Sequence, residues 1–207
     1  MDVVYNHVAG RPDAQNPLDR IDGDARSFYR WPDGHVTQTP WGDKPAYASQ
    51  AVKDLYTANA VQQVTELGVD GVRFDFVQVL HNTGSAEEKR EGMNTLRQIN
   101  RTLDLVRPGA FVVAEDFTHD WLVAGDLGQS ASTAGPDGLQ KRGMGFDAVW
   151  SDSFHHTLLG AVSGSRDMDA LAAALTQHVG VQRSEQALVY AHSHDEVGNS
   201  GQWITRV

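Results

Sequence analysis

Four short apolar runs in this chain each end at a polar or acidic residue, and this pattern constrains the fold more than any other feature. They are residues 1–7 (MDVVYNH), 71–75 (GVRFD), 111–115 (FVVAE) and 187–195 (ALVYAHSHD). Apolar runs of this length are typical of strands buried on both faces, as in parallel sheets. In barrels of alternating strands and helices, polar groups at the carboxyl ends of the strands converge on one mouth. We therefore expect Asp75, Glu115 and Asp195 to share a site.

The spacing of the runs favours alternation of strands and helices. Asp75 and Glu115 lie about 40 residues apart, and Glu115 and Asp195 about 80, whereas one strand-plus-helix unit takes about 30 residues or more. The longer interval needs a further strand, which we place at residues 145–150 (GFDAVW). The predicted fold class is therefore α/β, with strands and helices in alternation.

Capping signals predict the helices between these strands. Ser49 is a candidate N-cap for a helix that ends near Leu67. Residues 85–88 (SAEE) form a capping box that opens a helix toward Val106. Further helices are expected from residue 152 and over residues 169–178.

Composition narrows the classes of partner. The chain has 207 residues, with 17 basic and 27 acidic groups and a formal charge of −10, which argues against nucleic acid and fits a neutral ligand such as a sugar. It has no cysteine, which leaves the compartment open. No apolar stretch approaches a membrane span and no secretory signal precedes Met1, so we expect no membrane partner and a cytoplasmic location.

The four runs resemble, in the same order, four sequence segments of the α-amylase superfamily, glycoside hydrolase family thirteen. The matching elements are Asp-Val-Val-Tyr-Asn-His at residues 2–7, Gly-x-Arg-x-Asp at 71–75, an apolar strand ending in Glu115, and the pair His194–Asp195. Together they cover nearly the whole chain. The resemblance implies a (β/α)₈ barrel and a retaining enzyme that acts on α-1,4-glucans or maltooligosaccharides.

Retaining glycoside hydrolysis uses one ionised carboxylate and one protonated carboxyl group. The resemblance implies that Asp75 is the nucleophile, that Glu115 is the acid/base, and that Asp195 holds two hydroxyls of the sugar being cleaved. Arg73 would keep Asp75 ionised, because a nearby cation favours the charged form. The apolar strand before Glu115 favours the protonated form that donation requires.

The resemblance also implies ligand contacts and a metal. His7, Arg73 and His194 are the expected sugar-binding residues, and Asn6 braces the end of the first run. Asn6 is a calcium ligand in many relatives, so calcium is possible, although no cofactor is required. A zinc site around His192, His194 and Asp195 is the alternative interpretation of the last run.

Residues 8–47 are predicted to form a long loop, which in the family is a small subdomain that walls the sugar cleft. Its aromatic residues either stack on sugar faces or pack the subdomain itself. They are Tyr29, Trp31, Trp41 and Tyr47.

The segments resemble two different subfamilies, so hydrolysis and branching both stay open. Residues 2–7, 39–42 and 150–156 resemble maltooligosyl trehalose trehalohydrolases, whereas residues 115–116 and 193–197 resemble α-glucan branching enzymes. The two reactions share a covalent intermediate and differ in whether water or a glucan hydroxyl attacks it.

A complete (β/α)₈ barrel takes about 250 residues. By the resemblance, residues 1–207 run from the end of strand three to just after strand seven. We therefore expect a barrel fragment that is inactive and poorly soluble by itself. The alternative function is a truncated, non-catalytic fragment with at most weak glucan binding.

Overall fold

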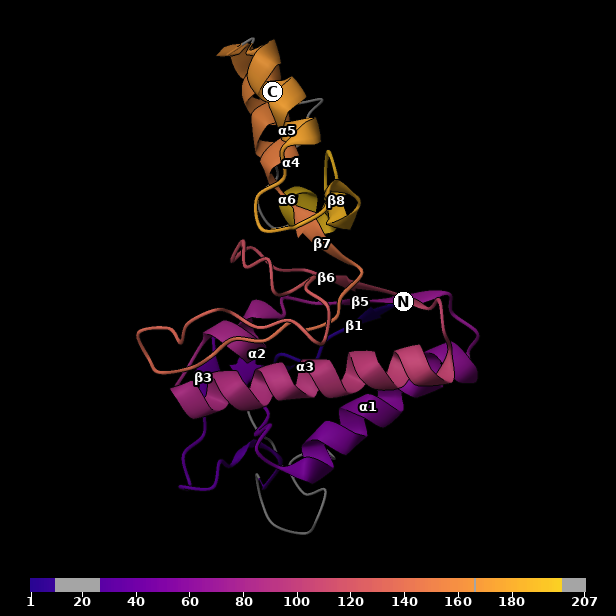
Figure 1. Cartoon of the computed structure of the whole chain (residues 1–207), viewed down its shortest axis with the longest axis vertical. Helices are drawn as coiled ribbons and strands as arrows, with labels where there is room; N and C mark the ends of the chain where they lie inside the picture. The colour runs from indigo at the N-terminus through magenta and orange to yellow at the C-terminus, as the bar shows by residue number, and fades with distance from the viewer. Residues whose placement is uncertain (10–26, 166, 199–207) are drawn as a thin grey trace.

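A five-stranded parallel sheet forms the centre of the molecule. The computed structural model describes residues 1–9, 27–165 and 167–198. The strands lie in the order β1-β5-β6-β7-β8, which is also their order along the chain (Figure 1). Their bounds are β1 (Asp2–Val3), β5 (Gly71–Phe74), β6 (Phe111–Ala114), β7 (Ala148–Ser151) and β8 (Ala187–Val189). Each pair of neighbours is parallel, which confirms the predicted α/β class.

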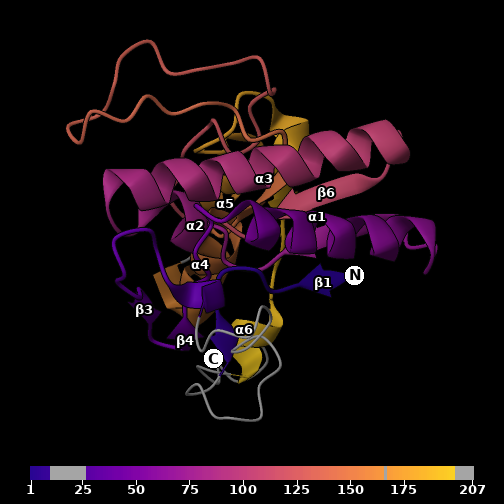
Figure 2. The ribbon, with the colours of Figure 1, turned by 90° about the horizontal axis from the view of Figure 1, so that it is seen from below.

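Two long helices lie side by side and cover one face of β1, β5 and β6 (Figures 1 and 2). They are α1 (Gln50–Thr65) and α3 (Ala86–Val106), and the short α2 (Gln78–Asn82) precedes α3. Beyond β7 follow α4 (Ser153–Gly160), a π-helical turn (Ala161–Ser165), α5 (Met168–Thr176), a 3₁₀ turn (Ser184–Gln186) and α6 (His194–Gly198). Of the helices in the described ranges, none combines the length and apolarity needed to cross a membrane.

The core lies between these helices and the sheet. Phe74 of β5 and Leu96 and Ile99 of α3 are buried there. Gly92 lets α3 approach α2 closely, because a Cβ at this position would lie 2.0 Å from the Leu80 carbonyl oxygen. Such packing fixes the positions of β5 and β6, the strands that carry the two predicted catalytic residues.

The observed helix caps agree with the sequence prediction more closely than the observed strand lengths do. Ser85 forms the predicted capping box, because its Oγ accepts from the Glu88 N–H at 3.2 Å and the Glu88 carboxylate accepts from the Ser85 N–H at 3.4 Å. Ser49 is the N-cap of α1 but makes no side-chain capping bond. The apolar run at 71–75 forms a strand only as far as Phe74, and a turn leads from it into α2.

The prediction that His194 and Asp195 end a strand is wrong. The strand β8 stops at Val189, and both residues lie in the first turn of α6. The cause is local, because Ser193 Oγ accepts from the Asp195 N–H at 3.1 Å and Glu196 accepts from the Ser193 N–H at 2.8 Å. These reciprocal bonds start a helix where the apolar run alone favoured a strand.

Part of the predicted loop at 8–47 lies outside the described residues, namely 10–26. The remainder carries a small antiparallel sheet rather than irregular chain only. Its order is β2-β4-β3, with bounds β2 (Val8–Ala9), β4 (Gly42–Asp43) and β3 (Gln38–Thr39). Tyr29, Trp31 and Tyr47 are buried and pack this region against α1, whereas Trp41 is half exposed.

Candidate active site

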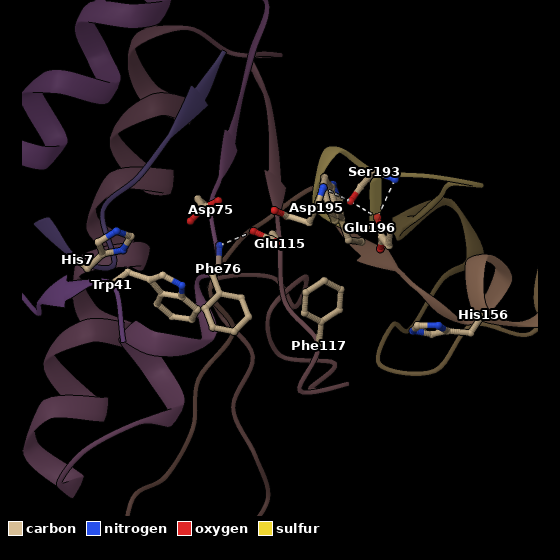
Figure 3. A pocket seen from close by; sticks show the side chains of 11 residues that line it. His7, Trp41, Asp75, Phe76, Glu115, Phe117, His156, Ser193, Asp195 and Glu196 are labelled. Carbon is tan, nitrogen blue, oxygen red and sulfur yellow. Dashed lines mark hydrogen bonds between the residues drawn. The ribbon is translucent and has the colours of Figure 1, made fainter. Parts of the chain in front are cut away.

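The three predicted acids meet in one pocket of about 660 Å³ (Figure 3). Asp75 follows β5, Glu115 follows β6, and Asp195 reaches the pocket from α6. The structure therefore brings together side chains that are far apart in sequence. The rest of the lining consists of His7, Trp41, Phe76, Phe117, Trp150, His156, Ser193 and Glu196.

Arg73 joins the two carboxylates from behind the pocket. Its Nη2 lies 2.8 Å from Glu115 Oε2, and its Nη1 lies 3.4 Å from Asp75 Oδ1. The guanidinium carbon also lies 4.1 Å from the centre of the Trp150 ring, a cation–π contact. Arg73 is not among the lining residues, so it contacts the two acids and Trp150 from outside the cavity.

The environment of Glu115 sets its protonation. Its side chain is buried, and burial raises its pKa to about 7. A hydrogen bond of 2.8 Å from the Phe76 N–H and the charge of Arg73 lower this pKa, while Asp75 and Asp195 raise it. Near neutral pH, Glu115 can therefore hold a proton and also release it, as an acid/base must.

Asp75 is oriented from both sides. The Nδ2 of the buried Asn6 donates to Asp75 Oδ2 at 2.9 Å and to its carbonyl oxygen at 2.7 Å. Arg73 reaches the other carboxylate oxygen. These contacts fit the predicted bracing role of Asn6, and they direct the Asp75 carboxylate toward the pocket (Figure 3).

The described residues do not fit a calcium site at Asn6. Its amide oxygen contacts His7 Nδ1, and its amide nitrogen is engaged by Asp75. No group of three or more His, Cys, Asp or Glu side chains in the described ranges could hold a metal ion, and this includes the region proposed for zinc. We assign no metal chemistry to this site.

The two histidines predicted to bind sugar occupy different positions. His7 lines the pocket, and burial lowers its pKa, which the charge of Asp75 opposes. His194 lies outside the lining, with its ring 6.4 Å from that of Trp150 and its Nε2 3.5 Å from Asp195 Oδ2.

The pocket has an aromatic side that the sequence revealed only in part. Trp41, Phe76 and Phe117 follow one another, with ring centres 5.3 Å and 6.3 Å apart (Figure 3). Trp41 was a predicted candidate, whereas Phe76 and Phe117 were not, although each closely follows a predicted catalytic acid. Ser193 and Glu196 were missed too, and the Ser-x-x-Glu pattern was the signal for them.

Comparison with curated proteins returns branching enzymes. The chain is 28% identical over 203 residues to the 1,4-alpha-glucan branching enzyme GlgB of Corynebacterium glutamicum, covering 90% of this chain and 26% of that protein. It is 28% identical over 162 residues to the same enzyme of Nitratidesulfovibrio vulgaris, covering 69% of this chain and 22% of that protein. The chain thus spans about a quarter of the length of these relatives. No family model matches it.

Comparison with solved structures returns α-amylase-like folds. A putative alpha amylase from Salmonella typhimurium superposes with a TM-score of 0.63 at 21% identity, over 96% of this chain and 34% of that one. The cyclic α-maltosyl-(1→6)-maltose hydrolase of Arthrobacter globiformis, in complex with its cyclic maltosyl-maltose, superposes with a TM-score of 0.63 at 18% identity. The match covers 94% of this chain and 41% of that one. A pullulanase from Anoxybacillus, in complex with maltotriose, superposes with a TM-score of 0.58 at 18% identity, over 98% of this chain and 29% of that one.

Proposed function

Because this chain belongs to the α-amylase superfamily, we propose that it carries the catalytic site of a retaining enzyme acting on α-1,4-glucans or maltooligosaccharides. The observation that supports this most is the joint contact of Arg73 with Asp75 and Glu115 at the wall of one pocket. Its curated relatives are branching enzymes, and its structural neighbours include amylases and a pullulanase.

In the first step, Asp75 attacks the anomeric carbon of the bound sugar while Glu115 gives its proton to the glycosidic oxygen. The bond between that carbon and that oxygen breaks, and a glycosyl ester forms on Asp75. In the second step, the Glu115 carboxylate takes a proton from the acceptor hydroxyl. The acceptor oxygen then displaces Asp75, so the configuration at the carbon is retained.

The contacts of Arg73 with both acids support the pairing of Asp75 and Glu115 that a retaining mechanism needs. Retaining enzymes hold their carboxyl groups about 5–5.5 Å apart, whereas inverting enzymes need about 6.5–9.5 Å to admit a water molecule. One planar guanidinium lies 2.8 Å from Glu115 and 3.4 Å from Asp75. The shared guanidinium keeps the two carboxyl groups near each other, as a retaining mechanism requires.

We propose an α-glucan as the partner of this pocket. The aromatic side offers flat apolar faces beside the acids, which suits sugar rings. Two structural neighbours were solved with maltotriose and with a cyclic maltosyl-maltose. The choice between a hydroxyl acceptor and water rests on the relatives, whose names favour branching.

A measurement on amylose separates these outcomes in the full-length protein. Hydrolysis creates one new reducing end for each bond cleaved, whereas branching leaves their number unchanged and creates α-1,6 linkages. We expect new α-1,6 linkages by NMR with few new reducing ends. Absence of any change in amylose would reject the proposed function.

We further propose that the five strands are part of a (β/α)₈ barrel. The described sheet is open, with β1 and β8 at its edges. The α-amylase-like solved structures superpose on nearly the whole of this chain, and the superposed part is about a third of their own length. Residues 1–207 alone would then leave strand edges exposed, which favours aggregation and supports an inactive fragment as the second candidate. Measuring solubility and glucan turnover of residues 1–207 beside the full-length protein tests this.

A further inference from the structure

The turn after β5 has an unusual backbone at Phe76. Its φ is +38°, in the left-handed region that bulky residues rarely adopt. Phe76 and His119 are the non-glycine residues with positive φ in the described part of the chain. Such conformations persist where the surrounding structure imposes them, and they gather at active sites.

This backbone brings two successive amides to one residue. The Phe76 N–H donates to Glu115 Oε2 at 2.8 Å, and the Val77 N–H donates to the Glu115 carbonyl oxygen at 2.9 Å. In an extended strand, successive N–H groups point in opposite directions, so they could not both reach Glu115. A left-handed residue within a turn makes neighbouring N–H groups converge on an anionic group.

We propose that Phe76 is a positioning residue whose left-handed backbone holds the Glu115 carboxyl group in place for proton transfer. The inference rests on the proposed role of Glu115 as the acid/base. It assigns the function to the main chain of Phe76. The phenyl ring lies in the pocket between Trp41 and Phe117 and has a separate role there.

The hydrogen bond also affects the charge state of Glu115. A bond donated to the carboxylate favours the ionised form, so losing it raises the pKa. The other charged or titratable groups that face Glu115 are Arg73, Asp75, Asp195 and Tyr190. None of them is altered by a substitution at Phe76, so a change in the Glu115 titration would report on the backbone bond.

A matched pair of substitutions separates the backbone from the ring. Phe76→Asn and Phe76→Val both remove the phenyl ring, and the two replacement side chains are similar in size. Asparagine tolerates the left-handed region, whereas a β-branched valine does not. We expect Phe76→Asn to keep the bond to Glu115 and Phe76→Val to lose it. Phe117→Asn and Phe117→Val are the control pair, because Phe117 lines the same pocket without a positive φ.

The experiment is a ¹³C NMR titration of glutamate carboxyl groups in the full-length protein, with Glu115→Gln to assign the resonance. Losing a hydrogen bond to a charged group shifts the pKa of that group by about one unit or more. The Glu115 pKa should therefore be about one unit higher in Phe76→Val than in Phe76→Asn. The Phe117 pair should titrate alike. If Phe76→Val does not fold, Phe76→Ala and Phe76→Gly form a milder pair. The Glu115 pKa should then be higher in Phe76→Ala than in Phe76→Gly, because glycine adopts the left-handed region freely.

Equal Glu115 pKa values in folded Asn and Val variants, or in the Ala and Gly variants, would overturn the inference. The titration needs no turnover, so it is separate from the test of glucan activity. An inactive protein that shows the expected pKa difference would reject the proposed function and keep the positioning role of Phe76. In an active protein, the basic limb of the pH–rate profile should move upward in Phe76→Val and stay in place in Phe76→Asn.

Discussion

The two halves of the parallel sheet differ in how well helices cover them. In the first half, β1, β5 and β6 lie on α1 and α3, and α3 buries Met93, Leu96, Ile99 and Leu103. In the second half, β7 and β8 are followed by α4 and α5, and Ala174 is the buried residue of α5. Met168 and Leu175 of α5 are about half exposed or more, at 63% and 49%. The first half has a closed core, whereas the second leaves apolar surface uncovered.

The proposed catalytic groups follow this division. Asp75, Glu115 and Arg73 all belong to the first half, where packing fixes the strand ends. Asp195 and His194 come from α6 in the second half. The proposed chemical pair is thus built on the well-covered half, whereas two of the expected sugar-holding groups, Asp195 and His194, come from the less covered half. Four predictions test this division and the roles of the groups placed on it, from the largest expected effect to the smallest.

Substitution of the nucleophile should have the largest effect. Asp75→Asn in the full-length protein should lower glucan turnover by about 10⁴-fold or more, because an amide cannot form the glycosyl ester. Asp195→Asn should cost less, about 10²–10³-fold, because it removes stabilisation without removing the covalent step. Steady-state turnover of both variants gives the comparison, and a larger loss in Asp195→Asn would reverse the assignment of roles.

The acid/base should show itself through pH and leaving group. With a pKa of about 7, Glu115 loses its proton as the pH rises through neutrality, so kcat/KM of the unmodified enzyme should fall above about pH 7. Glu115→Gln should lose turnover on natural glucans by about 10²–10⁴-fold and lose this basic limb. Formation of the intermediate from an activated glycosyl fluoride should be spared. An equal loss on both substrates would mean that Glu115 has a structural role instead.

Paired leucine substitutions compare the cores of the two halves. Leu96 of α3 is fully buried, so Leu96→Ala should lower the free energy of unfolding by about 2–5 kcal/mol. Leu175 of α5 is about half exposed, and Leu175→Ala should change it by about 0.5 kcal/mol or less. Urea unfolding of both variants provides the values. Similar losses would show that α5 is covered in the folded protein.

The smallest expected difference concerns helix caps within the first half. Ser85→Ala removes the bond that Ser85 Oγ accepts from the Glu88 N–H at the start of α3 and should cost about 1 kcal/mol of stability. Ser49→Ala should cost only a few tenths of that, about 0.3 kcal/mol, because Ser49 makes no side-chain capping bond. Thermal unfolding under identical conditions ranks the two, and the reverse order would contradict the capping assignment.

Local signals predicted much of this molecule, and tertiary effects account for the rest. The apolar runs predicted all five strands of the parallel sheet, and Ser85 with Glu88 predicted the start of α3. The sequence did not predict α6, because the apolar run at 187–191 outweighed the capping pattern that follows it.

Two features of the site could not be read from residue type. The left-handed φ of Phe76 contradicts its own preference, so only the surrounding fold produces it. The contact between Arg73 and Trp150 joins β5 to β7, and no spacing in the sequence specifies it. Three of the four cleft aromatics proved to be packing residues, because burial depends on how the subdomain meets α1.

The most direct test of the central claim is to trap the covalent intermediate. The Glu115→Gln variant of the full-length protein is incubated with maltosyl fluoride, quenched and digested, and the peptides are analysed by mass spectrometry. A retaining mechanism on Asp75 predicts a maltosyl adduct on the peptide that contains Asp75, and no adduct in a variant that also carries Asp75→Asn. An adduct on another residue, or turnover with inverted configuration and no adduct, would contradict the account.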